Sequence, residues 1–310
     1  MERKKSLSDT PVCSCCAEPA VIYLRYSHRH LCSTHLIHDI EERVFQAIEK
    51  NQMIQPGDRI AVALSGGKDS TALMLILSRY LRKSQGISLV AITVDEGIEG
   101  YRDETISAAK LVAENLGFEH HIIDFQDLYG RDLDTLLKGR ETEACTICGI
   151  LRRKALTNAA KKLGATKIAT GHNLNDEAQS VLMNVLRGDL PRFVRDSSAD
   201  SSDCFLPRIK PLAEIPEKEV VSYLFVRGMF QVLPECPYTR FALRAEVRSI
   251  ISNLEHRNPG TMLRLIESKK KIQKYLAGTP VSDPLHHCRL CGDPCSGEIC
   301  QVCRLHLSRG

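Results

Sequence analysis

Short apolar runs alternate with amphipathic runs through the middle of the chain. Four runs rich in β-branched residues predict strands at 60–64, 88–94, 120–125 and 166–170. Apolar residues recur at helical spacing at 39–50, 71–83, 104–116, 149–163 and 176–187, and again at 216–227 and 239–254, after a polar segment at 196–203. This alternation predicts an α/β fold with a parallel sheet and helices on both of its faces.

A turn rich in Ser and Gly joins the first of these strands to the following helix. Its residues are Ser65, Gly66, Gly67, Lys68, Asp69 and Ser70. A glycine turn at a helix N-terminus surrounds a small anion with backbone N–H groups, and glycine lets the backbone approach a phosphate. The turn is not a Walker A loop, because Val62 stands where that motif has Gly and Asp69 where it has Ser or Thr. It predicts another kind of phosphate site, the alternative being an ordinary turn that ends a buried strand.

Two further strands end in polar or glycine residues. Asp95-Glu96-Gly97 follows the strand at 88–94, and Gly171-His172-Asn173 follows the strand at 166–170. Ligands of parallel sheets bind outside the carboxyl ends of the strands. We therefore expect both segments to lie beside the turn at 65–70.

Two groups of cysteines, one near each end of the chain, have the spacing of zinc ligands. The chain has 13 cysteines and no apolar signal segment, so reduced, metal-bound thiols are expected rather than disulfides. Cys15 competes with Cys16, but only Cys16 gives the two-residue spacer, and we expect Cys295 to be no ligand. Closed four-ligand sites of this kind are structural. The predicted Zn²⁺ ligands are Cys13, Cys16, Cys32 and His35 in the first group, and Cys288, Cys291, Cys300 and Cys303 in the second.

A third group, Cys145, Cys148 and the distant Cys236, offers three ligands instead of four. Three thiolates do not close a tetrahedral zinc site, but they can hold an iron–sulfur cubane and leave one iron open. Two alternatives stay open: a redox CxxC pair with an unrelated Cys236, or a zinc site completed by a His.

Composition is ordinary for a soluble protein, with 43% hydrophobic and 26% charged residues among 310. No apolar run approaches the roughly 20 residues that span a bilayer, so we expect a cytoplasmic protein that does not associate with a membrane. The net charge is only +4, but residues 264–310 hold eight basic and four acidic side chains. A basic end of the chain is typical of contact with a nucleic-acid backbone, or of a solvated helix face.

The turn at 65–70 resembles the pyrophosphate loop (SGGxDS) of the N-type ATP pyrophosphatases, which adenylate a carbonyl oxygen. Over nearly its whole length the chain resembles the TtuA-type tRNA 2-thiolation enzymes and, more distantly, the TtcA-type cytidine thiolases. The stretches that carry the resemblance are 65–70, 95–98, 145–149 with 152–153, 171–174 with 176–179, and 235–238. It implies an N-terminal zinc finger at 1–38, a pyrophosphate-loop domain of the adenine nucleotide alpha hydrolase type at 39–255, a basic helical segment at 256–284 and a zinc ribbon at 285–310.

The resemblance also implies roles for particular residues. Cys145, Cys148 and Cys236 would hold a [4Fe-4S] cluster, and Asp176 would act at the nucleotide or the activated base. Arg152 stands where some relatives have Lys, and it would neutralise phosphate without exchanging protons. For ATP and Mg²⁺, the loop would hold the β- and γ-phosphates, with Lys68 on phosphate and Asp69 on the metal ion. The remaining expected nucleotide contacts are Ala63, Leu64, Thr93, Val94, Asp95, Gly171 and His172, the last of which could instead be structural.

The implied reaction is ATP-dependent 2-thiolation of a tRNA uridine. Adenylation of the C2 oxygen would provide AMP as a leaving group, and a sulfur atom would then replace it. A ubiquitin-like thiocarboxylate carrier or free sulfide would donate the sulfur, and the enzyme would be a homodimer. The modest charge and many cysteines favour the wobble position U34 over U54 of the T-loop. The alternatives are a cytidine 2-thiolase, another AMP-forming ligase of this group, and a non-enzymatic zinc-ribbon RNA-binding protein.

Overall fold

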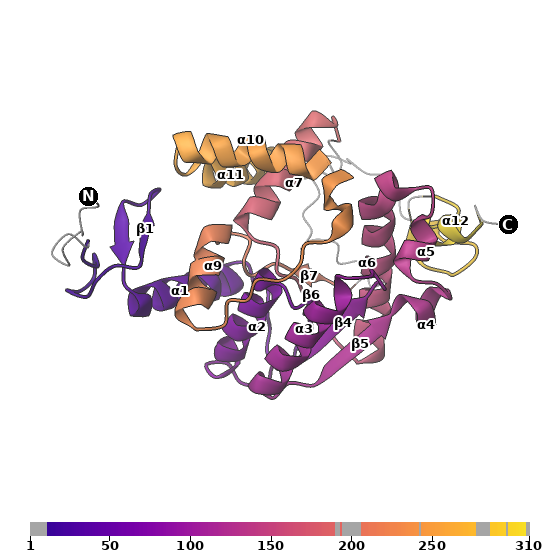
Figure 1. Ribbon diagram of the computed structural model, residues 1–310, viewed down its shortest axis with the longest axis horizontal. Coiled ribbons are helices and arrows are strands. Elements are labelled where there is room, and N and C mark those ends of the chain that lie inside the picture. Colours follow the sequence, from indigo (N-terminus) through magenta and orange to yellow (C-terminus); the bar gives the residue numbers. More distant parts are fainter. Residues whose placement is uncertain are drawn as a thin grey trace, which may run out of the picture.

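The structure is a computed structural model that describes residues 11–189, 193, 206–241, 243–276, 286–295 and 297–307. The predicted polar segment 196–203 and Cys204 lie outside these residues. The described chain forms a central sheet with helices around it. A small module with a set of potential metal ligands lies at each end of its long axis (Figure 1).

The central sheet has five parallel strands in the order β5-β4-β3-β6-β7. The strands are β3 (Arg59–Ala63), β4 (Ser88–Asp95), β5 (His120–Asp124), β6 (Lys167–Ala169) and β7 (Arg208–Ile209). The predicted parallel sheet is therefore confirmed. The sequence did not predict β7, whose two residues pair with Ile168 and Ala169.

Side chains of the strands alternate between two cores. On β3, Ile60 and Val62 face one core, whereas Ala61 faces the other. The first core is covered by α1 (Ser33–Lys50), α2 (Lys68–Leu81), α3 (Arg102–Leu116) and α9 (Glu217–Val226). The second is covered by α4 (Phe125–Tyr129), α5 (Leu133–Leu137) and α6 (Ala144–Lys162). Both faces of the sheet are buried, as predicted.

The strand order reverses between β3 and β6. From β3 the chain proceeds to β4 and β5 on one side, and it later continues from β6 to β7 on the other. A crevice for ligands forms outside the carboxyl ends of the strands at such a switch point. The turn at 65–70 follows β3 and the segment at 171–173 follows β6, so both segments flank this point.

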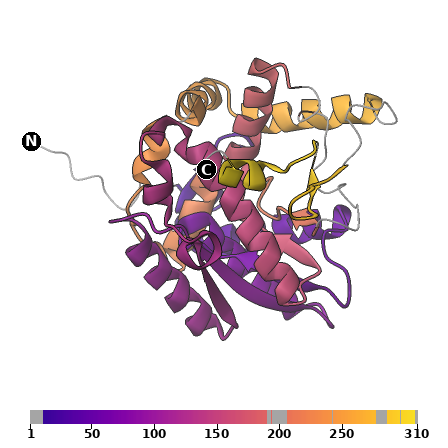
Figure 2. The same cartoon turned by 90° about the vertical axis from the view of Figure 1, so that its right-hand side faces the viewer.

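A third layer lies above the carboxyl edge of the sheet. It consists of α7 (Leu174–Leu186), α10 (Leu243–Arg257) and α11 (Thr261–Tyr275), which share a small apolar core of their own (Figures 1 and 2). The helices α10 and α11 both pack on α7. This layer carries the lysines of the basic segment on α11.

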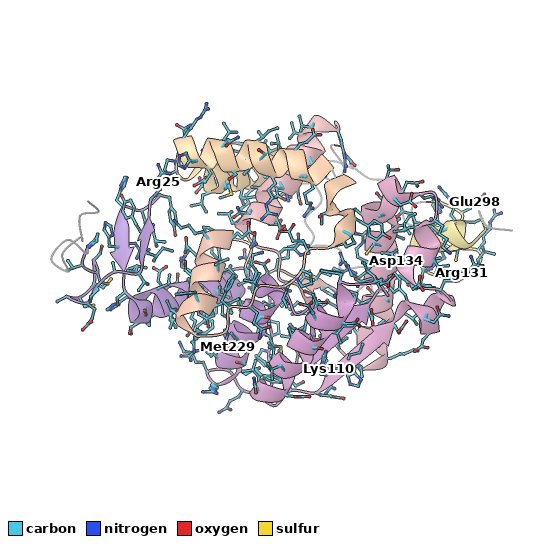
Figure 3. All side chains as sticks on the ribbon, in the orientation of Figure 1. Arg25, Lys110, Arg131, Asp134, Met229 and Glu298 are labelled. Carbon is cyan, nitrogen blue, oxygen red and sulfur yellow. The ribbon has the colours of Figure 1, made fainter. Side chains whose placement is uncertain are left out.

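The N-terminal module is a hairpin of β1 (Ile22–Leu24) and β2 (Arg29–Leu31) that leads directly into α1. Because α1 begins at Ser33, the predicted zinc finger and the domain after it share one continuous helix. Arg25 ties the hairpin to the third layer, since its Nη1 donates to the carbonyl of His256 at 2.9 Å (Figure 3).

The C-terminal module pairs β8 (His286–His287) with β9 (Pro294–Cys295) and ends in α12 (Gln301–Leu307). Helix α12 packs against α6. Lys154 of α6 also forms an ion pair with Asp293 of the module. The module therefore lies against the helix that carries two of the central cysteines, as the view in Figure 2 shows.

Candidate active site

The phosphate turn has a backbone that only glycine fits. Gly66 has φ +86°, and a Cβ added to it would lie 1.9 Å from the carbonyl oxygen of Thr105 in α3. Side chains close the turn from within, because the Ser65 N–H donates to Ser70 Oγ at 3.1 Å and Ser70 Oγ donates to the Gly67 carbonyl at 2.9 Å. Gly67 starts α2 without a side-chain cap. The first N–H groups of that helix therefore point at a place suited to an anion.

Two carboxylates share the ammonium group of Lys68. Its Nζ lies 2.9 Å from Asp69 Oδ2 and 2.9 Å from Glu217 Oε1 in the first turn of α9. Burial alone would lower the pKa of Lys68, but Asp69 and Glu217 raise it, so the lysine stays charged. Sequence reasoning missed Glu217, which follows the turn by about 150 residues and belongs to no motif.

The segment after β6 packs tightly against the start of α2. A Cβ on Gly171 would lie 2.8 Å from the carbonyl carbon of Asp69. Asn173 Nδ2 donates to Asp69 Oδ1 at 2.9 Å, while its Oδ1 accepts from the Asp176 N–H at 3.1 Å and so caps α7. The structure thus brings Asp69, Gly171 and Asp176 together, as the sequence predicted for the strand ends.

Arginines of α10 reach these acidic groups from above. Arg244 Nη1 lies 3.4 Å from Asp176 Oδ1, and Arg248 Nη2 lies 3.0 Å from Glu217 Oε1. Burial raises the pKa of Asp176, and Arg244 opposes that rise. Neither arginine was predicted, because a basic residue on an amphipathic helix gives no sign of its partner in the sequence.

His172 faces the same edge of the sheet. Its Nδ1 lies 2.8 Å from Thr170 Oγ1. The surrounding protein desolvates the ring and lowers its pKa, and nearby cations, among them Arg152, lower it further. His172 is therefore neutral at pH 7 and can serve as a hydrogen-bond donor or acceptor.

The residues expected around adenine are mostly buried. Leu64 is 0% exposed and Thr93 1%, with the Thr93 hydroxyl donating to the Leu64 carbonyl. Val94 is also buried, whereas Ala63 is partly exposed. Asp95 is used locally, since its Oδ1 accepts from the Gly97 N–H at 2.9 Å. Nucleotide contact by these residues stays a prediction.

A cavity of about 130 Å³ lies behind the phosphate turn, between α2, α3 and the end of α9. Its lining includes Gly66, Lys68, Asn115 and Met229, the last of which is labelled in Figure 3, but none of the central cysteines. This cavity is too small for ATP, so it does not define the nucleotide site.

Cys145 and Cys148 lie in the first two turns of α6 rather than before it. The predicted helix began at residue 149, after both cysteines, whereas α6 starts at Ala144. Cys236 precedes the 3-10 helix η3 (Pro237–Phe241), which packs on α6. The Cys145 thiol lies 3.8 Å from the Tyr238 carbonyl, and both Cys148 and Cys236 pack against the second core.

A partly buried hydrogen bond holds the segment with Cys236 in place. The Tyr238 hydroxyl donates to Asp134 Oδ1 at 2.8 Å, and Asp134 is labelled near the start of α6 in Figure 3. This contact joins two residues that are 104 positions apart. The distant Cys236 is therefore brought to the CxxC pair by the fold, as the three-cysteine interpretation requires.

The three central thiols do not form a group as tight as the zinc-type sets within the described ranges. In a cubane, each thiolate binds its own iron, so its sulfur atoms lie farther apart than those that share one ion. Burial raises the pKa of Cys148 to about 12 and also raises that of Cys236. Redox CxxC pairs have lowered pKa values instead, so this environment does not mark the pair as a disulfide-exchange motif.

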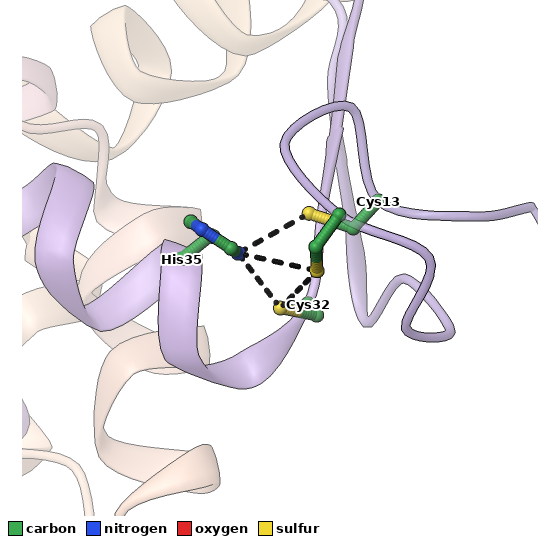
Figure 4. Close-up of side chains that lie close together, drawn as sticks. Cys13, Cys32 and His35 are labelled. Atoms are coloured by element: carbon green, nitrogen blue, oxygen red, sulfur yellow. Dashed lines mark hydrogen bonds between the residues drawn. The ribbon is translucent and has the colours of Figure 1, made fainter.

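The N-terminal set has the geometry of a zinc site. His35 Nδ1 lies 3.6 Å from Cys13 Sγ and 3.2 Å from Cys32 Sγ (Figure 4). Cys16 Sγ lies 3.8 Å from Cys32 Sγ. A tetrahedron with zinc bonds of about 2.0–2.3 Å has edges of roughly 3.5–3.8 Å, so these atoms could hold one Zn²⁺. Cys15 is not in the group, as predicted.

The C-terminal set is similar. Cys288, Cys291, Cys300 and Cys303 place their sulfur atoms within 4.8 Å of one another. Cys295 stays outside, and its thiol donates to the Gly297 carbonyl at 2.8 Å. Four convergent soft donors with no open position match a structural zinc ribbon.

Two protein families match the chain and define its class. The family described as "PP-loop domain" matches residues 36–252, and the family described as "2-thiouridine synthetase TtuA, N-terminal LIM domain" matches residues 12–37. The first match covers the sheet, the phosphate turn and α6. The chain is thus a PP-loop protein with a zinc-type module in front of the domain.

Relatives define the family more closely. The chain is 35% identical to "tRNA 2-thiolation protein NcsA" of Haloferax volcanii, over 94% of this chain and 97% of that protein. It is 37% identical to "Cytoplasmic tRNA 2-thiolation protein 1" of Mus musculus, over 97% of this chain and 73% of that protein. A solved structure, "U34-tRNA thiolase NcsA from Methanococcus maripaludis with its [4Fe-4S] cluster", superposes with a TM-score of 0.84 at 31% identity and covers 97% of each chain. The chain belongs to the PP-loop family of tRNA 2-thiolation proteins.

Among the described residues, no helix is both long and apolar enough to cross a bilayer.

Proposed function

We propose that this protein is an ATP-dependent tRNA 2-thiouridine synthetase that acts in the cytoplasm, at the wobble uridine U34. The observation that carries the proposal is the placement of a three-cysteine set and a phosphate turn around one edge of the sheet. Contacts support this proximity: Arg152, one turn after Cys148 on α6, lies 3.4 Å from Glu96. Glu96 in turn pairs with Arg102 of α3, the helix against which Gly66 packs. The U34-tRNA thiolase that superposes on the chain favours the wobble position.

The first half of the reaction depends on the phosphate turn. The uncapped N-terminus of α2, Ser65 and Ser70 would hold the β- and γ-phosphates of ATP. Asp69 would bind Mg²⁺ in place of its present partners, Lys68 and Asn173. Lys68 would then be free to contact phosphate. The C2 oxygen of uridine attacks the α-phosphate, pyrophosphate leaves, and the base becomes an adenylate.

The second half depends on the cysteines. Cys145, Cys148 and Cys236 would hold a [4Fe-4S] cluster, which supplies an open iron where a sulfur donor atom can bind. Arg152 would neutralise the departing AMP, and Asp176 would orient the base. Replacement of the C2 oxygen by sulfur then releases AMP. A thiocarboxylated ubiquitin-like protein or free sulfide would supply the sulfur.

The substrate RNA needs contacts beyond the pocket. The target base must leave the RNA stack to reach the chemistry. Basic residues of α11, such as Lys271 and Lys274, and the two zinc modules would bind the phosphate backbone and position the tRNA. We also propose that two chains form a homodimer and that both terminal sets bind Zn²⁺.

Two variants separate the two halves of the reaction. Cys148→Ala should remove the iron and abolish 2-thiouridine formation, while the Kd for a non-hydrolysable ATP analogue stays unchanged. Asp69→Ala should abolish tRNA-dependent AMP release while iron and acid-labile sulfide stay at wild-type levels. The measurements are iron analysis of anaerobically purified protein, isothermal titration calorimetry and mass spectrometry of tRNA digests mapped by position. Weaker nucleotide binding in the first variant, or full AMP release in the second, would refute these roles.

The same measurements separate the alternatives. A ligase of the ATP pyrophosphatase group needs no iron, so a protein that releases AMP without bound iron would fit that class. A thiolated cytidine in the digests would identify a cytidine 2-thiolase. A protein that binds tRNA but never releases AMP would be an RNA-binding protein without this activity.

A further inference from the structure

A buried carboxylate lies between two arginines beside the central cysteines. Glu96 follows β4 at the carboxyl edge of the sheet and is 2% exposed. Its Oε2 lies 2.9 Å from Arg102 Nε, and its Oε1 lies 3.4 Å from Arg152 Nη1. Glu96 therefore faces two permanent cations, and Arg102 Nε also lies 3.8 Å from Asp95 Oδ1.

Arg102 is a fixed part of the fold. It is 4% exposed, its Nη1 donates to Thr105 Oγ1 at 2.9 Å, and its Nη2 donates to the Val94 carbonyl. A buried carboxylate needs a partner, and Arg102 already supplies one. The second arginine is thus not needed to compensate the burial of Glu96.

Arg152 differs from Arg102 in its exposure. Its side chain is 55% exposed, and it follows Cys148 by one helical turn on α6, so the two share a face of that helix. The guanidinium that Glu96 holds therefore faces the cysteine site.

We propose that Glu96 is a positioning residue that holds the guanidinium of Arg152 beside the three-cysteine site, where Arg152 binds an anionic sulfur donor, hydrosulfide. This inference rests on the proposed function. The planar fork of arginine can donate one N–H to Glu96 and others towards the site at the same time, which a lysine cannot do with fixed geometry. Glu96 acts through Arg152 and touches no reactant.

The test measures hydrosulfide binding rather than turnover. Anaerobically reconstituted wild-type protein, Glu96→Gln, Arg152→Met and the double variant are titrated with sodium hydrosulfide and followed by visible absorption and by EPR of the reduced state. Glu96→Gln and Arg152→Met should each weaken hydrosulfide binding roughly tenfold, the loss of one charge-assisted hydrogen bond. The double variant should bind no more weakly than Arg152→Met alone.

Glu219→Gln is the matched control. Glu219 is also 2% exposed and pairs with an arginine, Arg43, but it lies on α9. It should lose stability as Glu96→Gln does, and its hydrosulfide affinity should stay at the wild-type value. This comparison separates positioning from a general effect of losing a buried ion pair.

A positioning role and a purely electrostatic role of Glu96 predict opposite changes in hydrosulfide affinity. If Glu96 acted only through its negative charge, its removal would make the site more positive, and Glu96→Gln would bind hydrosulfide more tightly. Tighter or unchanged binding, or effects of the two single variants that add in the double variant, would overturn the inference alone. A wild-type protein that assembles no iron would overturn the proposed function, and this inference with it.

Discussion

Replacement of Gly66 by Ala tests whether the phosphate turn depends on its backbone geometry. With φ at +86°, an L-residue pays about 1–2 kcal/mol for the left-handed conformation. The new Cβ would also lie 1.9 Å from the Thr105 carbonyl oxygen, a contact that must be relieved by moving the turn or α3. Relief of such overpacking typically costs about 1–3 kcal/mol. We expect Gly66→Ala to lower the free energy of unfolding by about 2–5 kcal/mol.

The same movement should displace the first N–H groups of α2. Binding of a non-hydrolysable ATP analogue, measured by isothermal titration calorimetry, should therefore weaken at least tenfold. Gly164→Ala is the control, because Gly164 has φ +67° and no atom lies within 4 Å of an added Cβ. It should lose only the conformational cost and should keep full nucleotide affinity. A Gly66→Ala protein that matches Gly164→Ala in urea unfolding and in calorimetry would refute the reasoning.

Two further predictions concern metal content and pH. Cys300→Ser should reduce bound zinc, measured by inductively coupled plasma mass spectrometry, from two equivalents to one, with iron unchanged; two retained equivalents would exclude a ribbon site at this cysteine. Burial raises the pKa of Asp58, but hydrogen bonds from Lys167, Thr166 and Gln55 lower it below its ordinary value. Its stabilisation is therefore present above the unfolded pKa of about 3.9 and is lost as pH falls through the folded value. Asp58→Asn should unfold about 1–2 kcal/mol more easily than wild type at pH 7, and the difference should shrink below pH 4 in urea titrations; a constant difference would contradict this.

Local patterns were sufficient to predict most of the sheet. The strands at 60–64, 88–94, 120–125 and 166–170 are confirmed, because each is a short apolar run bounded by turn residues. Strand β7 was missed, since two residues carry no periodicity. Helix α6 was predicted to begin five residues too late, because Cys, Thr, Ile and Gly at its start are weak helix formers, and tertiary packing rather than helix propensity stabilises its first turns.

The two terminal sets of potential zinc ligands were also predictable from local patterns. The spacings of Cys13 with Cys16 and of Cys288 with Cys291 are local, and the structure brings each complete set together. Glu217 and Arg244 were missed as functional candidates, and Glu96 was singled out only as part of the segment 95–97, without a role. Each has a partner at least 56 residues away, and a single charged residue gives no indication in the sequence of which distant group it will meet.

The central claim is that iron, held by Cys145, Cys148 and Cys236, and a nucleotide at the turn 65–70 occupy one site. Crystals of anaerobically reconstituted protein with a non-hydrolysable ATP analogue, measured at the iron absorption edge, test this directly. We predict an iron anomalous peak bound to the three sulfur atoms and nucleotide phosphates at the N-terminus of α2, both open to the same space. An iron peak elsewhere, a zinc edge at these cysteines, or phosphates bound away from the turn would contradict the account.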